Sequence, residues 1–119
     1  MKREYRFFLE DMISCINAVE EFVRGMDFDE FLEDDKTTSA VIRKFEIIGE
    51  AAKHIPPAIR EKYARIPWKS VIGLRDRLTH AYFGIDHQLV WDLIQTEFPK
   101  LRDVLEEILA ATAGENHKS

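Results

Sequence analysis

The sequence predicts an all-α bundle in which two long antiparallel helices pack with shorter helices between them. Apolar residues recur at alternating intervals of four and three over long stretches, which is the spacing of one helical face. No segment shows the sustained alternation of apolar and polar residues that is typical of a half-exposed strand. The chain has 119 residues, 45% of them hydrophobic and 33% charged, as expected for one globular domain. We expect this domain to span residues 1–112 and to be followed by a disordered tail, residues 113–119.

Three helices are expected in the first half of the chain. The four-three spacing over residues 8–26 predicts a long helix, and Gly25 is a suitable stop. Asp27 is a suitable N-cap for a short helix through FDEFLEDD, because the acidic first turn of that segment interacts favourably with the helix dipole. The same spacing over residues 37–54 predicts the second long helix, which the two prolines at 56–57 end.

Prolines mark the start of the next helices. Pro57 suits the first turn of a short helix, AIREKYA, and Pro67 suits the start of another. We expect that second helix to run through residues 68–84. Asp86 is a suitable N-cap for a last helix, whose apolar stripe crosses Pro99 without a phase break. An unbroken stripe through a proline predicts a kinked helix or two nearly coaxial helices.

Several classes of protein are excluded by composition. The single cysteine, Cys15, excludes an internal disulfide and any cysteine-rich zinc site. His54, His87 and His117 stand apart with no ligand spacing, so no metal site is predicted. No apolar run reaches the roughly 18 to 20 residues that span a bilayer, and the first residues lack the apolar stretch of a signal peptide. A cytoplasmic protein without membrane contacts is the simplest expectation.

Charge is distributed unevenly. The net charge of −5 argues against a protein that coats nucleic acid. Residues 1–35 hold eleven acidic and four basic side chains, whereas residues 60–80 hold six basic and two acidic ones. The second block is able to meet phosphates, although a solvated basic face is the alternative interpretation. Its basic residues are Arg60, Lys62, Arg65, Lys69, Arg75 and Arg77.

The segment GLRDRLTHAY holds four side chains of the kinds that take part in catalysis: Arg75, Asp76, His80 and Tyr82. If the predicted helix continues through them, His80 lies roughly opposite the apolar core face, with Asp76 one turn before it. Arg75 and Tyr82 then form a stripe along one flank, together with Thr79. His80 is therefore expected outside the core.

A second subunit is expected to cover this polar strip. Ile72 and Phe83 also lie off the core face of the predicted helix, close to the polar residues. A homodimer explains both observations, because two copies of the strip then meet in one cleft. Glu46, Glu50 and Lys53 share a face of the second long helix, where they either line that cleft or form a solvated ion-pair strip.

These groups suit phosphodiester cleavage in RNA without a metal. The imidazole of His80 is able to take a proton from a ribose 2′-hydroxyl or give one to the leaving oxygen, because its pKa is ordinarily near 6.5. The guanidinium of Arg75 is able to hold two phosphate oxygens and offset the charge that grows in the transition state. Asp76 is expected to fix the imidazole tautomer. The alternative is a set of solvated side chains without catalytic role.

The sequence resembles one known family. Arg75, four residues, then His80, Ala81 and Tyr82 match the RX4HXY motif of HEPN-domain ribonuclease toxins, the HepT-like family. The similarity covers about residues 3–110, in order and spacing. It is carried by the segments GMDFDEFLEDDKT, VIRKFEIIGEAAKHIP and IPWKSVIGLRDRLTHAYFGID, and by the VW that precedes the proline-containing helix.

The resemblance implies a HEPN-type homodimer that acts as the toxin of a toxin-antitoxin system. Arg75 and His80 are then the catalytic pair of a composite site that cleaves RNA, with Asp76 as a polar support and no cofactor. Tyr82 is the residue that a minimal nucleotidyltransferase (MNT) antitoxin adenylylates with AMP from ATP. AMP on Tyr82 places an anionic group beside Arg75, where it competes for the phosphate site. RNA, and not DNA, is the expected substrate.

Two other functions are consistent with the same residues. The first is a non-catalytic helical dimer that binds the nucleotidyltransferase partner or a nucleotide in the cleft. The second is a purely structural helical dimer. Substitution of Arg75 or His80 discriminates among them, because only a ribonuclease loses RNA cleavage while it keeps partner binding.

Overall fold

The computed structural model describes residues 4–80 and 84–116, and the side chains of these residues except those of His80 and residues 114–116. Most of the described chain is helical, which confirms the predicted all-α class. The elements in chain order are α1 (Tyr5–Phe22), α2 (Phe28–Glu33), α3 (Asp35–Ala52), α4 (Pro57–Lys62), α5 (Trp68–Ile72), α6 (Leu74–Leu78), β1 (Thr79–His80), β2 (Gly84–Ile85), α7 (His87–Asp92), the π-helical segment η1 (Leu93–Glu97) and α8 (Phe98–Asn116).

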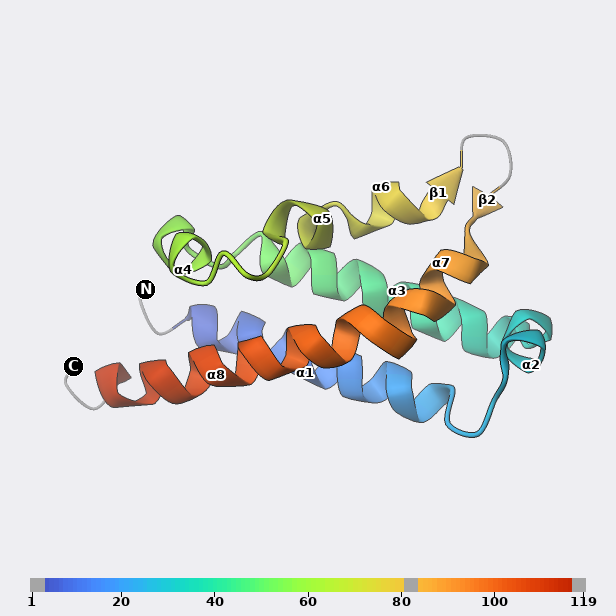
Figure 1. Ribbon diagram of the computed structural model, residues 1–119, viewed down its shortest axis with the longest axis horizontal. Helices are drawn as coiled ribbons and strands as arrows, with labels where there is room; N and C mark the ends of the chain where they lie inside the picture. The colour runs from blue at the N-terminus through green and yellow to red at the C-terminus, as the bar shows by residue number, and fades with distance from the viewer. Residues whose placement is uncertain (1–3, 81–83, 117–119) are drawn as a thin grey trace.

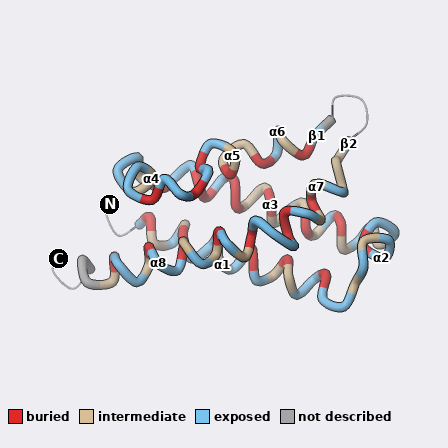
Figure 2. The backbone as a smooth tube through the Cα atoms, in the orientation of Figure 1, coloured by how far each residue is buried: buried red, intermediate tan, exposed pale blue. Residues whose placement is uncertain are grey.

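Three long helices form the body of the molecule. α1 and α3 pack along their whole length as an antiparallel pair, and α8 lies along α1 (Figure 1). The short helices α5 and α6 pack against α3. Buried residues line the facing sides of these helices (Figure 2). The largest fully buried side chains are Phe31, Phe45, Leu9, Met12, Ile16, Ile48, Ile55, Leu74, Leu78, Leu93, Leu105 and Ile108.

Local signals in the first half place the helices as predicted. Gly25 follows α1 with a φ of 79°, a conformation that glycine adopts without strain. Asp27 and Glu30 form a reciprocal capping box at the start of α2, with hydrogen bonds of 2.8 and 2.9 Å. α3 begins two residues before the predicted start, because Asp34 accepts a hydrogen bond of 3.0 Å from the Thr37 amide.

The prediction of one helix over residues 68–84 is wrong. The helix breaks at Gly73 and ends at Leu78. The Thr79 amide donates to the Asp76 carbonyl, while the Thr79 hydroxyl donates to the carbonyl of Arg75 at 2.9 Å. In a continuing helix the Arg75 carbonyl accepts its hydrogen bond from the backbone N–H of Thr79. Here the Thr79 hydroxyl donates that hydrogen bond instead, so the backbone is able to turn into β1.

A two-residue strand pair replaces the end of the expected helix. β1 and β2 are antiparallel, with Thr79 opposite Ile85 and His80 opposite Gly84. Gly84 has a φ of 77°, which favours glycine at this position. His80 is therefore not part of the helix that carries Asp76, so the expected spacing of one helical turn between them is absent. The expected helical stripe of Arg75 and Thr79 also ends here.

The last helix bends without a break, as the stripe across Pro99 predicts. α7, η1 and α8 form one continuous helical run (Figure 1). Pro99 has no N–H to donate to the preceding turn, and a π-helical turn lies directly before it. In that turn the Phe98 amide donates to the Leu93 carbonyl, five residues back.

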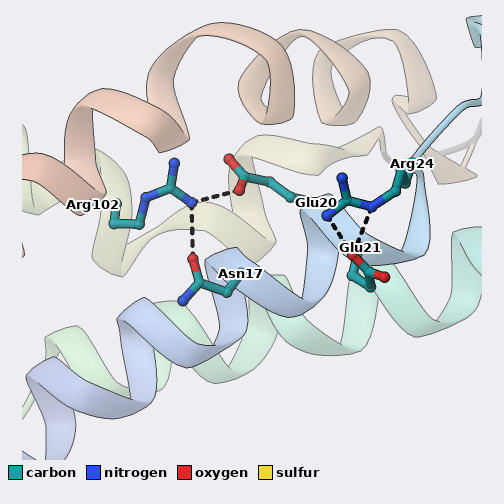
Figure 3. Close-up of polar contacts among 5 residues, drawn as sticks. All are labelled: Asn17, Glu20, Glu21, Arg24 and Arg102. Carbon is teal, nitrogen blue, oxygen red and sulfur yellow. Dashed lines mark hydrogen bonds and ion pairs between the residues drawn. The ribbon is translucent and has the colours of Figure 1, made fainter.

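Polar contacts tie α8 to α1 at two levels. Arg6 donates from α1 to the Leu109 carbonyl at 3.0 Å and to the Thr112 hydroxyl at 2.5 Å. Arg102 reaches from α8 to Asn17 and Glu20 of α1 (Figure 3). α8 continues to Asn116, four residues past the boundary that the sequence analysis places after residue 112. The domain boundary and the disordered tail stay predictions.

Cys15 packs in the core at 5% exposure. Burial raises the pKa of its thiol. No helix in residues 4–80 or 84–116 combines the length and the apolar character that a membrane span requires. Within the same residues no three His, Cys, Asp or Glu side chains gather as metal ligands.

Candidate active-site groove

Arg75 lies on α6, which α5 holds close to α3. The contact is close because Gly49 has no side chain: a Cβ at this position would lie 3.2 Å from the carbonyl oxygens of Val71 and Ile72. Leu74 and Leu78 anchor α6 in the core, at 1% and 2% exposure. The Arg75 side chain is exposed beside α3.

A groove follows α3 beneath Arg75. A hollow of about 370 Å³ lies between α1, α3 and the α5–α6 pair, and a smaller one of about 150 Å³ extends toward β2. Arg75 and Glu46 line both hollows, and Glu46 also lines a third, of about 300 Å³, further along α3. We call the three hollows together the α3 groove. Its aromatic and charged lining consists of Phe8, Asp11, Arg43, Phe45, Glu46, Glu50, Lys53, His54, Arg75 and His87.

The guanidinium of Arg75 has no carboxylate within ion-pairing distance among the residues that the structure describes. Its neighbours differ: Arg77 pairs with Glu97 at 3.6 Å, and Arg43 pairs with Glu46 at 3.3 Å. An exposed guanidinium without an acidic partner is a suitable ligand for a phosphate, because its planar fork is able to donate to two oxygens at once.

The other predicted site residues follow Arg75 closely in the chain. Asp76 is exposed on α6 and makes no side-chain hydrogen bond or ion pair with another described residue. The backbone of His80 lies in β1, two residues after α6 ends, and pairs with Gly84. Tyr82 lies outside the described residues. Arg75 and Asp76 thus lie within α6, and the His80 backbone follows the C-terminal end of this helix in β1.

The basic block of residues 60–80 does not form one surface. Arg65 pairs with Glu107 at 2.6 Å, and both Arg65 and Arg77 line a separate hollow of about 160 Å³ next to α8. Glu107 of α8 thus pairs with Arg65, and Glu97 of η1 pairs with Arg77. Arg75 is directed elsewhere, to the α3 groove.

The ion-pair strip expected on α3 is present, whereas the dimer cleft stays a prediction. Glu46, Glu50 and Lys53 line the α3 groove. They also form i,i+3 ion pairs on it, at 3.4 Å for Lys53 with Glu50. Sequence reasoning missed one feature, the stacking of Phe8 on His54 with ring centroids 4.4 Å apart. The two residues lie on different segments of the chain, so local spacing gives no signal for their contact.

The comparisons with known proteins identify a ribonuclease family. The family model described as Ribonuclease HepT-like matches residues 12–108. A protein of Methanocaldococcus jannaschii that is named as a putative RNase is 42% identical over 118 residues, which cover 99% of this chain and 98% of that protein. A protein of Thermococcus cleftensis that is named as a probable ribonuclease HepT is 43% identical over 108 residues, which cover 91% of this chain and 98% of that protein.

No solved structure gives a significant match. The family model covers most of the chain, and relatives near 40% identity extend along nearly all of it. The chain belongs to the HepT-like ribonuclease family.

Proposed function

We propose that this protein is a metal-independent endoribonuclease that acts as the toxin of a toxin-antitoxin system. One observation carries the proposal: in a chain of a ribonuclease family, the exposed Arg75 lines a groove and has no acidic partner among the described residues. His80 follows five residues later, in β1, just past the C-terminal end of α6. Arg75 and His80 are the catalytic pair, and Asp76 supports them.

The reaction is a transesterification within the RNA strand. The ribose 2′-oxygen attacks the adjacent phosphorus and loses its proton to an imidazole, while the bond from phosphorus to the 5′-oxygen breaks. The leaving 5′-oxygen takes a proton from a second group, and a 2′,3′-cyclic phosphate remains. Arg75 holds the phosphate oxygens and offsets their added negative charge. Imidazole and guanidinium supply the proton transfer and the charge, so the mechanism needs no metal.

A homodimer supplies the second imidazole. Two copies of His80 in one cleft act as base and acid in the same step. Half-buried isoleucines support a covered groove, because Ile42, Ile72 and Ile85 line it and leave part of their apolar surface in water. Sedimentation velocity at micromolar concentration tests this: a dimer is expected, and a monomer contradicts the composite site.

A nucleotidyltransferase antitoxin neutralises the toxin by adenylylating Tyr82. The chemistry supports this because the added phosphate is anionic, like the RNA phosphate that Arg75 binds, so the two compete. Incubation with the cognate nucleotidyltransferase and ATP should add the mass of AMP to Tyr82. The Tyr82→Phe variant should stay unmodified, and AMP on another residue contradicts the assignment.

Toxicity in cells separates the enzyme from the binding module. Arg75→Ala and His80→Ala should abolish growth inhibition while each variant still binds the nucleotidyltransferase in a pull-down. Arg77→Ala is the matched control, since Arg77 lies on the same short helix and pairs with Glu97 away from the groove. If the variant with both Arg75 and His80 replaced stays as toxic as the parent, catalysis by these residues is wrong and the binding module becomes the better account.

A further inference from the structure

We infer that the stacked rings of Phe8 and His54 form a platform for one base of a single-stranded RNA whose phosphate lies on Arg75. This inference rests on the function proposed for Arg75 and adds to it a subsite that determines affinity. All three side chains line the same hollow of about 370 Å³.

The platform is built before any ligand arrives. The two rings are nearly parallel, with centroids 4.4 Å apart and an angle of 15° between their planes. Phe8 is half-buried and packs against the core, whereas His54 is exposed at the end of α3. Phe8 therefore covers one face of the imidazole, and we infer that the exposed His54 offers its other face to a ligand. A base on that open face extends the stack without ordering a free side chain first.

The surrounding charges favour a base at this end and a phosphate at the other. Asp11 and Glu50 line the hollow one turn from Phe8 and His54 and repel a phosphate there. Glu46 also lines the hollow, but it pairs with Arg43 at 3.3 Å. Arg75 is the cation in the hollow without an acidic partner among the described residues. Lys53 pairs with Glu50 at 3.4 Å, but both side chains are more than half exposed, so this pair is weak. An uncharged base beside an arginine-bound phosphate fits this pattern.

Aromatic rings next to cations are the usual composition of sites for single-stranded nucleic acid. Each stacked base contributes appreciable affinity, and stacking tolerates any base because every base has a π-face. The platform therefore strengthens binding of unpaired RNA without reading its sequence. It also excludes the interior of an intact duplex, whose bases are already stacked on their neighbours.

The test uses an RNA hexamer in which every ribose carries a 2′-O-methyl group, so that no 2′-hydroxyl is available for attack. Its affinity is measured by fluorescence anisotropy for the parent and for His54→Ala, His54→Phe and Phe7→Ala. His54→Ala should weaken binding by about 5- to 100-fold, and His54→Phe should restore it. Phe7→Ala should change nothing, because Phe7 is aromatic, 69% exposed and adjacent in sequence, but does not line the groove.

A second probe isolates the stacking contact. Hexamers with one abasic position are compared with the intact hexamer. At one position, removal of the base should lower the affinity of the parent as much as the His54→Ala substitution does. Removal of the same base should not lower the affinity of the His54→Ala variant any further. If abasic substitution lowers the affinity of the parent and of His54→Ala equally at every position, the proposed stacking platform is wrong.

The remaining outcomes separate this inference from the function on which it rests. If Arg75→Ala abolishes cleavage but His54→Ala binds the hexamer as the parent does, the platform fails and the ribonuclease stands. If Arg75→Ala cleaves normally while the abasic cycle shows coupling to His54, the platform stands and the assignment of Arg75 fails. If His54→Ala shifts sedimentation from dimer to monomer without coupling to any base, the surface binds a second copy and the inference is wrong.

Discussion

Gly49 allows the close approach of α3 and α5 that positions Arg75, so Gly49→Ala tests how the site is built. The added methyl group would lie 3.2 Å from the carbonyl oxygens of Val71 and Ile72. These oxygens belong to backbone, which is unable to swing away as the end of a flexible side chain does. α5 must therefore shift by a few tenths of an ångström, and α6 with Arg75 follows it in the chain.

Two opposing effects set the size of the change. Overpacking in a well-packed contact costs about 1–3 kcal/mol. Alanine in place of glycine inside a helix raises the free energy of unfolding by about 1 kcal/mol, because alanine has the higher helix propensity. We expect Gly49→Ala to lower the free energy of unfolding by about 1 kcal/mol, which lowers Tm by about 4 °C in a domain of this size. Gly49→Val should lower it further, because valine is larger and has lower helix preference.

Urea unfolding followed by circular dichroism measures these changes, and RNA cleavage measures the displacement of Arg75. Cleavage by Gly49→Ala should fall at a temperature where the variant is fully folded. Ser39→Ala, at an exposed position of the same helix, is the control for helix preference. If Gly49→Ala is more stable than the parent by about 1 kcal/mol and cleaves RNA normally, the close contact does not constrain the site.

Four further predictions concern stability and reactivity. Arg102→Ala removes two hydrogen bonds between α8 and α1 and should lower the free energy of unfolding by about 1 kcal/mol in urea. Arg24→Ala should leave Tm unchanged, because its ion pair is exposed and local (Figure 3). The buried Cys15, with its raised pKa, should react with iodoacetamide only as fast as the protein opens, and fast labelling of the native protein contradicts its burial. The hydrogen bond from the Thr37 amide lowers the pKa of Asp34, so this cap stabilises the fold above the unfolded pKa, near 4, and loses its effect as the pH falls through the lower folded value. Asp34→Asn should therefore be less stable than the parent at neutral pH and close to it at pH 2, in urea titrations at both values, and an equal deficit at both pH values contradicts the role of the charge.

Helix signals predict most of this fold because they are local. The capping box of Asp27, the glycine stop at Gly25 and the four-three stripes all act within a few residues, and each is present in the structure. The proline at 99 was also interpreted correctly, since the apolar stripe that crosses it already shows that both sides pack on one core.

The error over residues 68–84 has a physical cause. Apolar spacing predicts a continuous helix there, but it carries no information about single side chains that end a helix. Gly73 weakens the helix in its middle, and the Thr79 hydroxyl takes the carbonyl of Arg75. A β-branched residue that satisfies this carbonyl favours a turn into the extended backbone of β1.

The α3 groove could be predicted only in part. The chemistry of Arg75 and the helix face of Glu46 predict that these residues belong to a site, and both line the groove. The contact of Phe8 with His54 joins α1 to the end of α3, and the neutralisation of Arg65 by Glu107 joins distant segments as well. Contacts of this kind depend on how helices pack, and no periodic pattern in one segment encodes them.

The central claim is that Arg75 and His80 cleave RNA without a metal. The most direct measurement is cleavage of single-stranded RNA by the purified protein in excess EDTA, with the parent, Arg75→Ala, His80→Ala and Arg77→Ala compared at equal folded concentration. The parent and Arg77→Ala should leave 2′,3′-cyclic phosphate ends at similar rates, while the rate of each of the other two variants should fall by about 100-fold or more. Cleavage by Arg75→Ala at the parent's rate, or no cleavage of several RNA classes by a folded parent, would contradict the claim.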